Sequence, residues 1–90
     1  MEIRWVRDKD RYANGWFGYT GHWKVFYLYW DAGSPPKNDE GETLNWRLTC
    51  NLPGIKDVLG NYLKETEGME KALAVLNYWV GRLEEGNDGK

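Results

Sequence analysis

The chain has only one cysteine and one histidine among its 90 residues. A single cysteine, Cys50, cannot form an intramolecular disulfide, which excludes a secreted scaffold held by disulfide bonds and favours the reducing cytoplasm. A single histidine, His22, removes any metal site or proton relay that needs two imidazoles. We expect His22 to be a surface residue at a strand end, and Cys50 to be a buried, protonated thiol.

Long hydrophobic runs and an excess of one charge are also absent. No segment approaches the 18 or so apolar residues that span a bilayer, so we expect no membrane contact. Twelve basic and fourteen acidic residues leave a net charge of −2, which argues against duplex nucleic acid as a partner. No motif matches a catalytic, metal or phosphate signature, so the sequence predicts neither an enzyme nor a cofactor.

Aromatic residues, by contrast, are abundant and unevenly placed. The chain has six Trp, six Tyr and two Phe, and nine of these fourteen residues lie between Tyr12 and Trp30. Aromatic side chains supply large buried areas and flat stacking faces, so this density either fills a core or is offered to a partner. Alternation along a strand cannot send every ring to one side of a sheet. We therefore expect at least two or three of the nine to be exposed.

The apolar pattern predicts an antiparallel sheet of three or four strands, which lie near residues 2–7, 16–19, 22–30 and 44–52. Asn14-Gly15 is typical of a tight hairpin turn, and a second break falls at Thr20-Gly21. The last strand alternates cleanly and points inward with Leu44, Trp46, Leu48, Cys50 and Leu52. Residues 31–43 are rich in Gly, Pro and Asn, which predicts a long mobile loop.

Two helices are expected after the strands. Apolar residues recur at helical spacing between Ile55 and Leu63, which predicts a short helix over 55–64. A longer amphipathic helix is predicted over 67–85, with Thr66 as its N-cap. We expect the longer helix to pack on one face of the sheet.

The whole pattern predicts one α+β domain over residues 1–86 and a disordered tail over 87–90. A single helix cannot cover both faces of the sheet, so some aromatics of the central strand should face outward. Strict alternation divides them into two sets, with Trp23, Tyr27 and Tyr29 on one face and Phe26 and Trp30 on the other. Since exposed Trp and Tyr dominate binding hot spots, the candidate partner-binding residues are Trp23, Phe26, Tyr27, Tyr29 and Trp30.

Three features together resemble the small sheet-plus-helix proteins that bacteriophages encode. They are the Trp- and Gly-rich hairpin, the Trp46-Arg47-Leu48 strand before Leu52-Pro53-Gly54, and a final helix that carries Ala72 and Trp79-Val80. The resemblance implies a cytoplasmic accessory protein, of the kind that inhibits a host enzyme or defence complex by binding and blocking it.

Two hypotheses from different classes follow. The first is a non-catalytic protein-binding module, whose partner is a host factor or a second copy of the chain in a homodimer. The alternative is a binding domain whose exposed Trp and Tyr stack on a small ligand or on single-stranded nucleic acid. In the alternative, the N-terminal cations would assist, namely Arg4, Arg7, Lys9 and Arg11.

Overall fold

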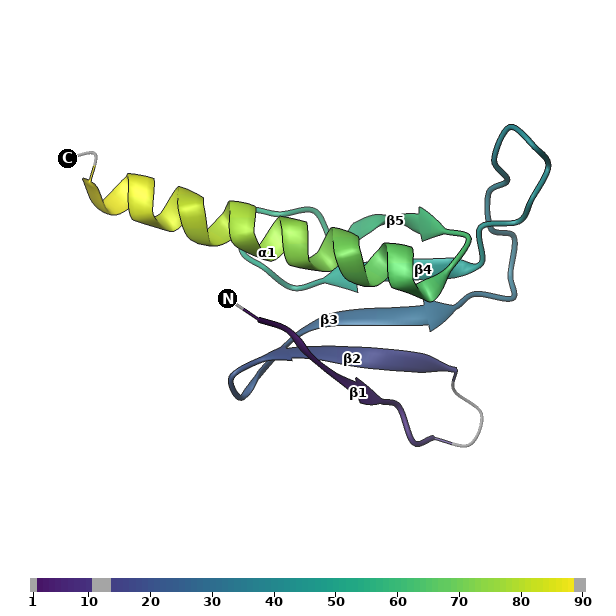
Figure 1. Ribbon diagram of the computed structural model, residues 1–90, viewed down its shortest axis with the longest axis horizontal. Helices are drawn as coiled ribbons and strands as arrows, with labels where there is room; N and C mark the ends of the chain where they lie inside the picture. The colour runs from purple at the N-terminus through teal and green to yellow at the C-terminus, as the bar shows by residue number, and fades with distance from the viewer. Residues whose placement is uncertain (1, 11–13, 89–90) are drawn as a thin grey trace.

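The computed structural model describes residues 2–10 and 14–88. Five antiparallel strands form one sheet in the order β1-β2-β3-β4-β5, and one helix lies across it (Figure 1). The elements are β1 (Arg4–Arg7), β2 (Gly15–Thr20), β3 (Trp23–Trp30), β4 (Trp46–Cys50), β5 (Val58–Tyr62) and α1 (Glu65–Asp88). The predicted α+β class, antiparallel sheet and long C-terminal helix are confirmed, but the sheet has five strands rather than three or four.

The short helix predicted over 55–64 is wrong, because this segment contains β5. Val58–Tyr62 pairs with the outer edge of β4, so that Tyr62 lies opposite Trp46 and Gly60 opposite Leu48. A helix here would leave that edge of β4 without backbone partners, and a glycine at position 60 weakens a helix by about 1 kcal/mol. The β4–β5 pairing contains a bulge, which interrupts strict alternation along β5. The apolar residues of this segment therefore have a spacing that resembles that of a helix.

The tight turn predicted at Asn14-Gly15 is also wrong. Gly15 is the first residue of β2, where an added Cβ would lie 2.9 Å from the carbonyl oxygen of Leu28. Close approach of β3, rather than a positive φ, therefore explains this glycine. The two-residue hairpin turn is at Gly21-His22, between the paired Thr20 and Trp23, and Gly21 has a φ of 62°.

The hydrophobic core lies between α1 and the sheet, where α1 packs on β3, β4 and β5. The inward alternation predicted for β4 is confirmed, since Leu48 and Cys50 are buried. From α1, Ala72 and Leu76 are fully buried one turn apart. The buried core residues are Val25, Phe26, Leu28, Leu48, Cys50, Leu52, Ala72 and Leu76.

Small residues on α1 let the helix approach the sheet closely. A Cβ added at Gly68 would lie 2.6 Å from Cδ1 of the fully buried Leu28, whereas one added at Gly81 would meet nothing within 4 Å. Both substitutions gain about 1 kcal/mol of helix propensity, but Gly68→Ala also overpacks the core by about 1–3 kcal/mol. We expect Gly81→Ala to raise the free energy of unfolding. The free energy of unfolding of Gly68→Ala should be lower than that of Gly81→Ala by about 1–3 kcal/mol, as measured by urea titration. Equal stabilisation by both would contradict this packing.

α1 begins earlier and ends later than predicted. Its N-terminus is capped by Glu67, whose Oε1 accepts a hydrogen bond from the backbone N–H of Lys64, so Thr66 is not the N-cap. Glu65 also ties this end to β2, because its Oε2 accepts a 2.7 Å hydrogen bond from Trp16 Nε1. At the other end, the helix includes residues 87 and 88 of the predicted tail, and residues 89 and 90 lie outside the described residues.

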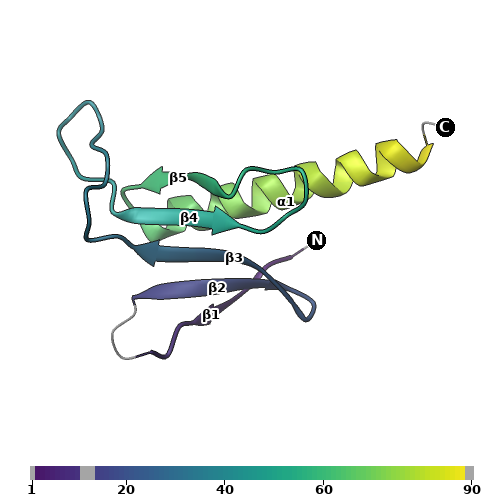
Figure 2. The same ribbon diagram turned by 180° about the vertical axis from the view of Figure 1, so that it is seen from behind.

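α1 is too long for the sheet that it covers. Its 24 residues span about 36 Å, and its C-terminal half extends beyond the ends of the strands in both views (Figures 1 and 2). With this overhang, the Cα radius of gyration is 14.4 Å, against about 12 Å for a compact chain of this length. The overhanging half of α1 therefore has apolar positions that the sheet does not cover.

The segment over 31–43 is a loop, as predicted, and it projects from the end of the sheet opposite the overhang (Figure 1). It contains its own turn, closed by a bridge between Lys37 and Thr43. Within the turn, Asn38 Oδ1 accepts hydrogen bonds from the backbone N–H groups of Glu40 and Glu42.

Candidate functional site

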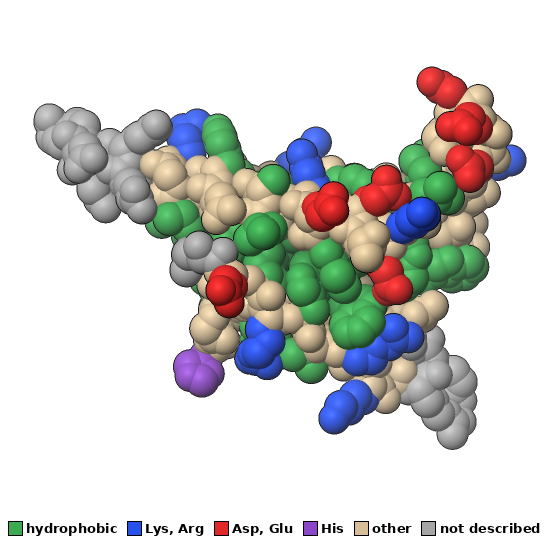
Figure 3. All heavy atoms as spheres, in the orientation of Figure 1, with side chains coloured by type: hydrophobic (Ala, Val, Ile, Leu, Met, Phe, Trp, Pro, Cys, Tyr) green, Lys and Arg blue, Asp and Glu red, His purple; other side chains and the backbone are tan. Residues whose placement is uncertain are grey.

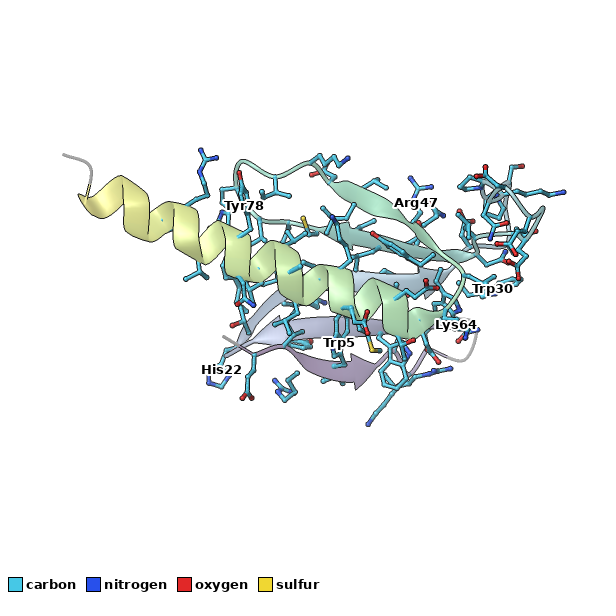
Figure 4. All side chains as sticks on the ribbon, turned by 45° about the horizontal axis from the view of Figure 1, so that its top comes forward. Trp5, His22, Trp30, Arg47, Lys64 and Tyr78 are labelled. Carbon is cyan, nitrogen blue, oxygen red and sulfur yellow. The ribbon has the colours of Figure 1, made fainter. Side chains whose placement is uncertain are left out.

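The five residues predicted to bind a partner are divided among three environments. Trp23 and Trp30 lie on the α1 side of the sheet and are 42% and 45% exposed. Phe26 is 1% exposed and belongs to the core, so it is not available to a partner. Tyr27 and Tyr29 are half-buried on the face turned away from α1. Figure 4 shows Trp30 near the N-terminal end of α1, far from the overhang.

A β-bulge explains why Trp23 does not share a face with Tyr27. In the pairing of β2 with β3, Gly18 lies opposite Phe26 and Tyr19 opposite Lys24, so Val25 is an extra residue on β3. One extra residue reverses the alternation beyond it. Trp23 therefore turns to the α1 side, where its ring meets that of Trp79 edge to face at 5.8 Å. The sequence around Val25 does not predict this bulge.

The face turned away from α1, here called the open sheet face, is lined by a row of stacked rings. Tyr27 stacks on Phe17 at 4.7 Å between ring centroids and on Tyr29 at 5.1 Å. Lys24 Nζ lies 4.3 Å from the centroid of the Phe17 ring, and the Arg4 guanidinium lies 4.9 Å from that of Tyr19. Figure 2 shows this face in front of α1. Its rings are thus largely engaged with one another and with cations.

The Tyr27 hydroxyl is held by Asp8. It donates a 2.7 Å hydrogen bond to Asp8 Oδ2, and the backbone N–H of Asp10 donates to Asp8 Oδ1. Burial of the ring, followed by the bond to Asp8, raises the pKa of Tyr27 to about 12. The same bond, followed by that from Asp10, holds the pKa of Asp8 below its usual value. The folded state therefore favours neutral Tyr27 and ionised Asp8.

These pKa shifts predict a pH dependence of folding stability. Since the pKa of Tyr27 is raised from 10.0 to about 12, its contribution should be complete below pH 10 and be lost as the pH rises through 12. Since the pKa of Asp8 is lowered, its contribution should be lost as the pH falls through that lowered value. Ultraviolet titration should show the loss of one late-ionising tyrosine in Tyr27→Phe, whereas Tyr62, whose pKa is also raised by burial, should still ionise late in both chains. Loss of titration amplitude near pH 10 rather than near pH 12 in Tyr27→Phe would contradict this assignment.

A groove beside α1 is also lined by apolar side chains. It lies between α1 and the loop that joins β4 to β5, has a volume of about 610 Å³, and continues into a second hollow of about 250 Å³. We call the two together the α1 groove. Its apolar lining comes from Pro53, Ile55, Leu59, Val75, Tyr78, Trp79 and Leu83.

Two residues of the overhang dominate the exposed apolar surface of the α1 groove. Tyr78 is 56% exposed and Leu83 is 50% exposed. Figure 4 shows Tyr78 on the side of α1 that faces the β4–β5 loop. Arg82 orients the Tyr78 ring, because its Nη1 donates a 2.8 Å hydrogen bond to the Tyr78 hydroxyl and its guanidinium lies 5.7 Å from the ring centroid.

The walls of the α1 groove are fixed to one another. Trp79 Nε1 donates a 2.9 Å hydrogen bond to the carbonyl oxygen of Pro53, which holds the β4–β5 loop against α1. The contact between Trp23 and Trp79 braces the same wall from the β2–β3 hairpin. A groove with fixed walls loses little conformational entropy when an occupant binds, which favours affinity.

Positive charge borders the α1 groove. Lys56, Lys71 and Arg82 line it, and no Asp or Glu side chain of the described residues does. Within the part of the chain that the structure describes, neither lysine has a carboxylate partner. Lys and Arg side chains also stand along the upper side of α1 in the space-filling view (Figure 3). The groove is thus apolar inside and cationic at its border, although the chain is slightly acidic overall.

No residue of the α1 groove was assigned a binding role from the sequence, where the apolar stripe of the final helix indicated packing alone. A signal was present, because Tyr78 falls beside that stripe on a helix longer than the sheet beneath it. Arg82, four residues later, lies on the same side of the helix as Tyr78. Among the N-terminal cations expected to assist a ligand, Arg11 lies outside the described residues, and Arg7 covers the Trp16 ring on the α1 side at 5.0 Å.

The single histidine and the single cysteine are not among the described residues that line the α1 groove. His22 is exposed in the β2–β3 turn, at the corner that Figure 4 labels, as expected for a surface histidine. Cys50 is buried, and its Sγ lies 3.4 Å from the carbonyl oxygen of Lys56 as a hydrogen-bond donor. Among the described residues, no three His, Cys, Asp or Glu side chains gather in a way that could hold a metal ion.

Comparison with known proteins adds no relative to this description, because no protein-family model, curated protein or solved structure matches the chain. Over residues 2–10 and 14–88, no helix has the length and apolarity needed to cross a membrane.

Proposed function

We propose that this chain is a non-catalytic protein-binding module whose binding surface is the α1 groove. The observation that carries the proposal is the exposure of Tyr78 and Leu83 beside an apolar groove with fixed walls. Large, exposed aromatic and aliphatic side chains next to a concave surface are typical of protein-binding hot spots. The resemblance to small phage proteins adds that the partner is a host enzyme or defence complex, which the module blocks.

The alternative, binding of a small ligand or a single strand by the open sheet face, has weaker support. Bases and sugar rings stack on free aromatic faces. On this sheet, Tyr27 is stacked between Phe17 and Tyr29, and Lys24 covers the Phe17 ring. A ligand would have to displace these contacts before it could stack.

Photo-crosslinking in the cell that naturally makes the chain tests this proposal. One variant carries p-benzoylphenylalanine in place of Tyr78, in the α1 groove, and a matched variant carries it in place of Tyr19, on the open sheet face. We expect a discrete protein adduct from position 78 and none from position 19, with mass spectrometry identifying the captured protein. An adduct from position 19 alone, or from neither position, would contradict the proposal.

A further inference from the structure

We propose that the α1 groove binds an acidic amphipathic helix of the partner protein. This inference rests on the proposed function and adds the chemistry of the segment that the groove recognises. It follows from the order of charged and apolar side chains along the groove, and from the absence of acidic side chains among its described lining residues.

The α1 wall of the groove presents one continuous stripe of the helix. Lys71, Val75, Tyr78 and Arg82 follow one another at steps of four, three and four residues, which keeps them on the same side of α1. Eleven residues separate Lys71 from Arg82, or about 16 Å along the helix axis. The wall therefore matches about three turns of an occupant helix.

The apolar and the cationic residues of the lining together select the occupant. Ile55, Leu59 and Val75 form the apolar lining between the two ends, and the cations stand at its border, with Lys56 on the loop facing α1. An amphipathic helix that enters such a groove places apolar residues at i, i+4 and i+7 inside it. Its flanking positions then face Lys56, Lys71 and Arg82, where Glu or Asp gains attraction and Lys or Arg meets repulsion.

Local charge, rather than composition, produces this preference. The whole chain has a net charge of −2, yet the described lining of the groove holds three cations and no carboxylate. Because Lys56 and Lys71 have no carboxylate partner among the described residues, an incoming acidic side chain breaks no existing ion pair. Complementary charge of this kind speeds association and excludes partners of the wrong sign.

Three synthetic peptides test the inference on the full chain. Each has 16 residues with Leu at the same i, i+4 and i+7 positions, and the flanking positions carry Glu in the first peptide, Gln in the second and Lys in the third. Titrations are followed by amide chemical shifts of the isotope-labelled protein. We expect the Glu peptide to bind at least tenfold more tightly than the Lys peptide, with shifts at Ile55, Val75 and Tyr78. Its affinity should also fall as salt is raised.

Charge reversal supplies the matched control. The double variant Lys56→Glu, Lys71→Glu should reverse the order of the Glu and Lys peptides. The double variant Lys9→Glu, Lys37→Glu makes the same change in net charge at exposed positions outside the groove, and it should keep the order of the wild type. Thermal unfolding of both variants checks that each remains folded, which we expect because all four lysines are exposed.

Four outcomes would overturn the inference. The first is equal binding of the three peptides, and the second is a Glu preference that survives Lys56→Glu, Lys71→Glu. The third is peptide-induced shifts confined to the open sheet face, and the fourth is a dimer in which a second copy of the chain fills the groove. If the crosslinker at position 78 still captures a protein, the first two outcomes remove only the acidic preference and leave the proposed function standing. A missing adduct at position 78 removes the proposed function itself.

Discussion

Leu76→Ala should lower the free energy of unfolding by about 2–5 kcal/mol, the largest loss of stability expected from a single substitution on α1. Leu76 is fully buried between α1 and the sheet, so truncation removes apolar contacts and leaves a cavity that the strands cannot close. For a domain of this size, such a loss lowers the melting temperature by about 10 °C or more. Urea titration followed by circular dichroism measures the change.

Leu73→Ala is the matched control, because it makes the same chemical change three residues earlier on the same helix. Leu73 is 40% exposed, whereas Leu76 is 0% exposed. Both substitutions gain the same small amount of helix propensity, so the difference between them reports burial alone. We expect Leu73→Ala to cost less than half as much as Leu76→Ala. Similar losses from the two substitutions would mean that α1 presents a different face to the sheet.

The second large effect is expected on binding. The double variant Tyr78→Ala, Leu83→Ala should weaken binding of the protein captured at position 78 by about 30-fold if one of the two is a hot spot, and by several hundred-fold if both are, because each truncation at a hot spot costs about 2 kcal/mol. Both residues are at least half exposed, so the free energy of unfolding should change little. Isothermal titration calorimetry with the captured protein measures the affinity of each variant.

Trp30→Ala serves as the control for binding. Trp30 is an exposed aromatic residue of the set predicted from the sequence, and it lies at the other end of the sheet from the overhang. We expect its truncation to leave the affinity within about threefold of the wild type. If Trp30→Ala abolished binding while Tyr78→Ala, Leu83→Ala did not, the aromatic cluster of the central strand would be the binding site in place of the α1 groove.

Much of the fold could be predicted from local patterns in the sequence. The clean alternation over Leu44–Leu52 gave the correct inward face of β4, since one face of that strand is buried and the other is not. The long apolar stripe correctly predicted α1. Its buried face contains no proline, and the buried Gly68 does not break the helix. The break at Thr20-Gly21 gave the β2–β3 turn, because Gly21 takes the positive φ that a tight turn requires.

The errors come from features that depend on contacts between distant segments. Residues 55–64 have helical apolar spacing, but β4 offered an unpaired edge, and pairing with it satisfied more backbone groups than a short helix would. Val25 reads as an ordinary strand residue, yet it is the extra residue of the bulge that turns Trp23 toward α1. Neither outcome can be deduced from a window of neighbouring residues.

The candidate site was harder to predict than the fold for a related reason. The density of aromatics between Tyr12 and Trp30 predicted a binding site on the central strand. In the structure, Phe26 belongs to the core, and Tyr27 and Tyr29 stack with neighbouring rings. The α1 groove instead depends on how far α1 runs past the sheet and on where the β4–β5 loop is held. Both are tertiary properties that the sequence does not state locally.

The central claim is that Tyr78 lies on a surface left free for a partner. One measurement tests this claim most directly. It is the photochemically induced nuclear polarisation of the tyrosines, recorded on a sample whose mass is followed by light scattering. We expect the mass of a single 10.5 kDa chain, strong polarisation of Tyr78, and weak polarisation of the stacked Tyr27 and Tyr29. The mass of two chains together with a protected Tyr78 would contradict it, because the α1 groove would then be filled by a second copy.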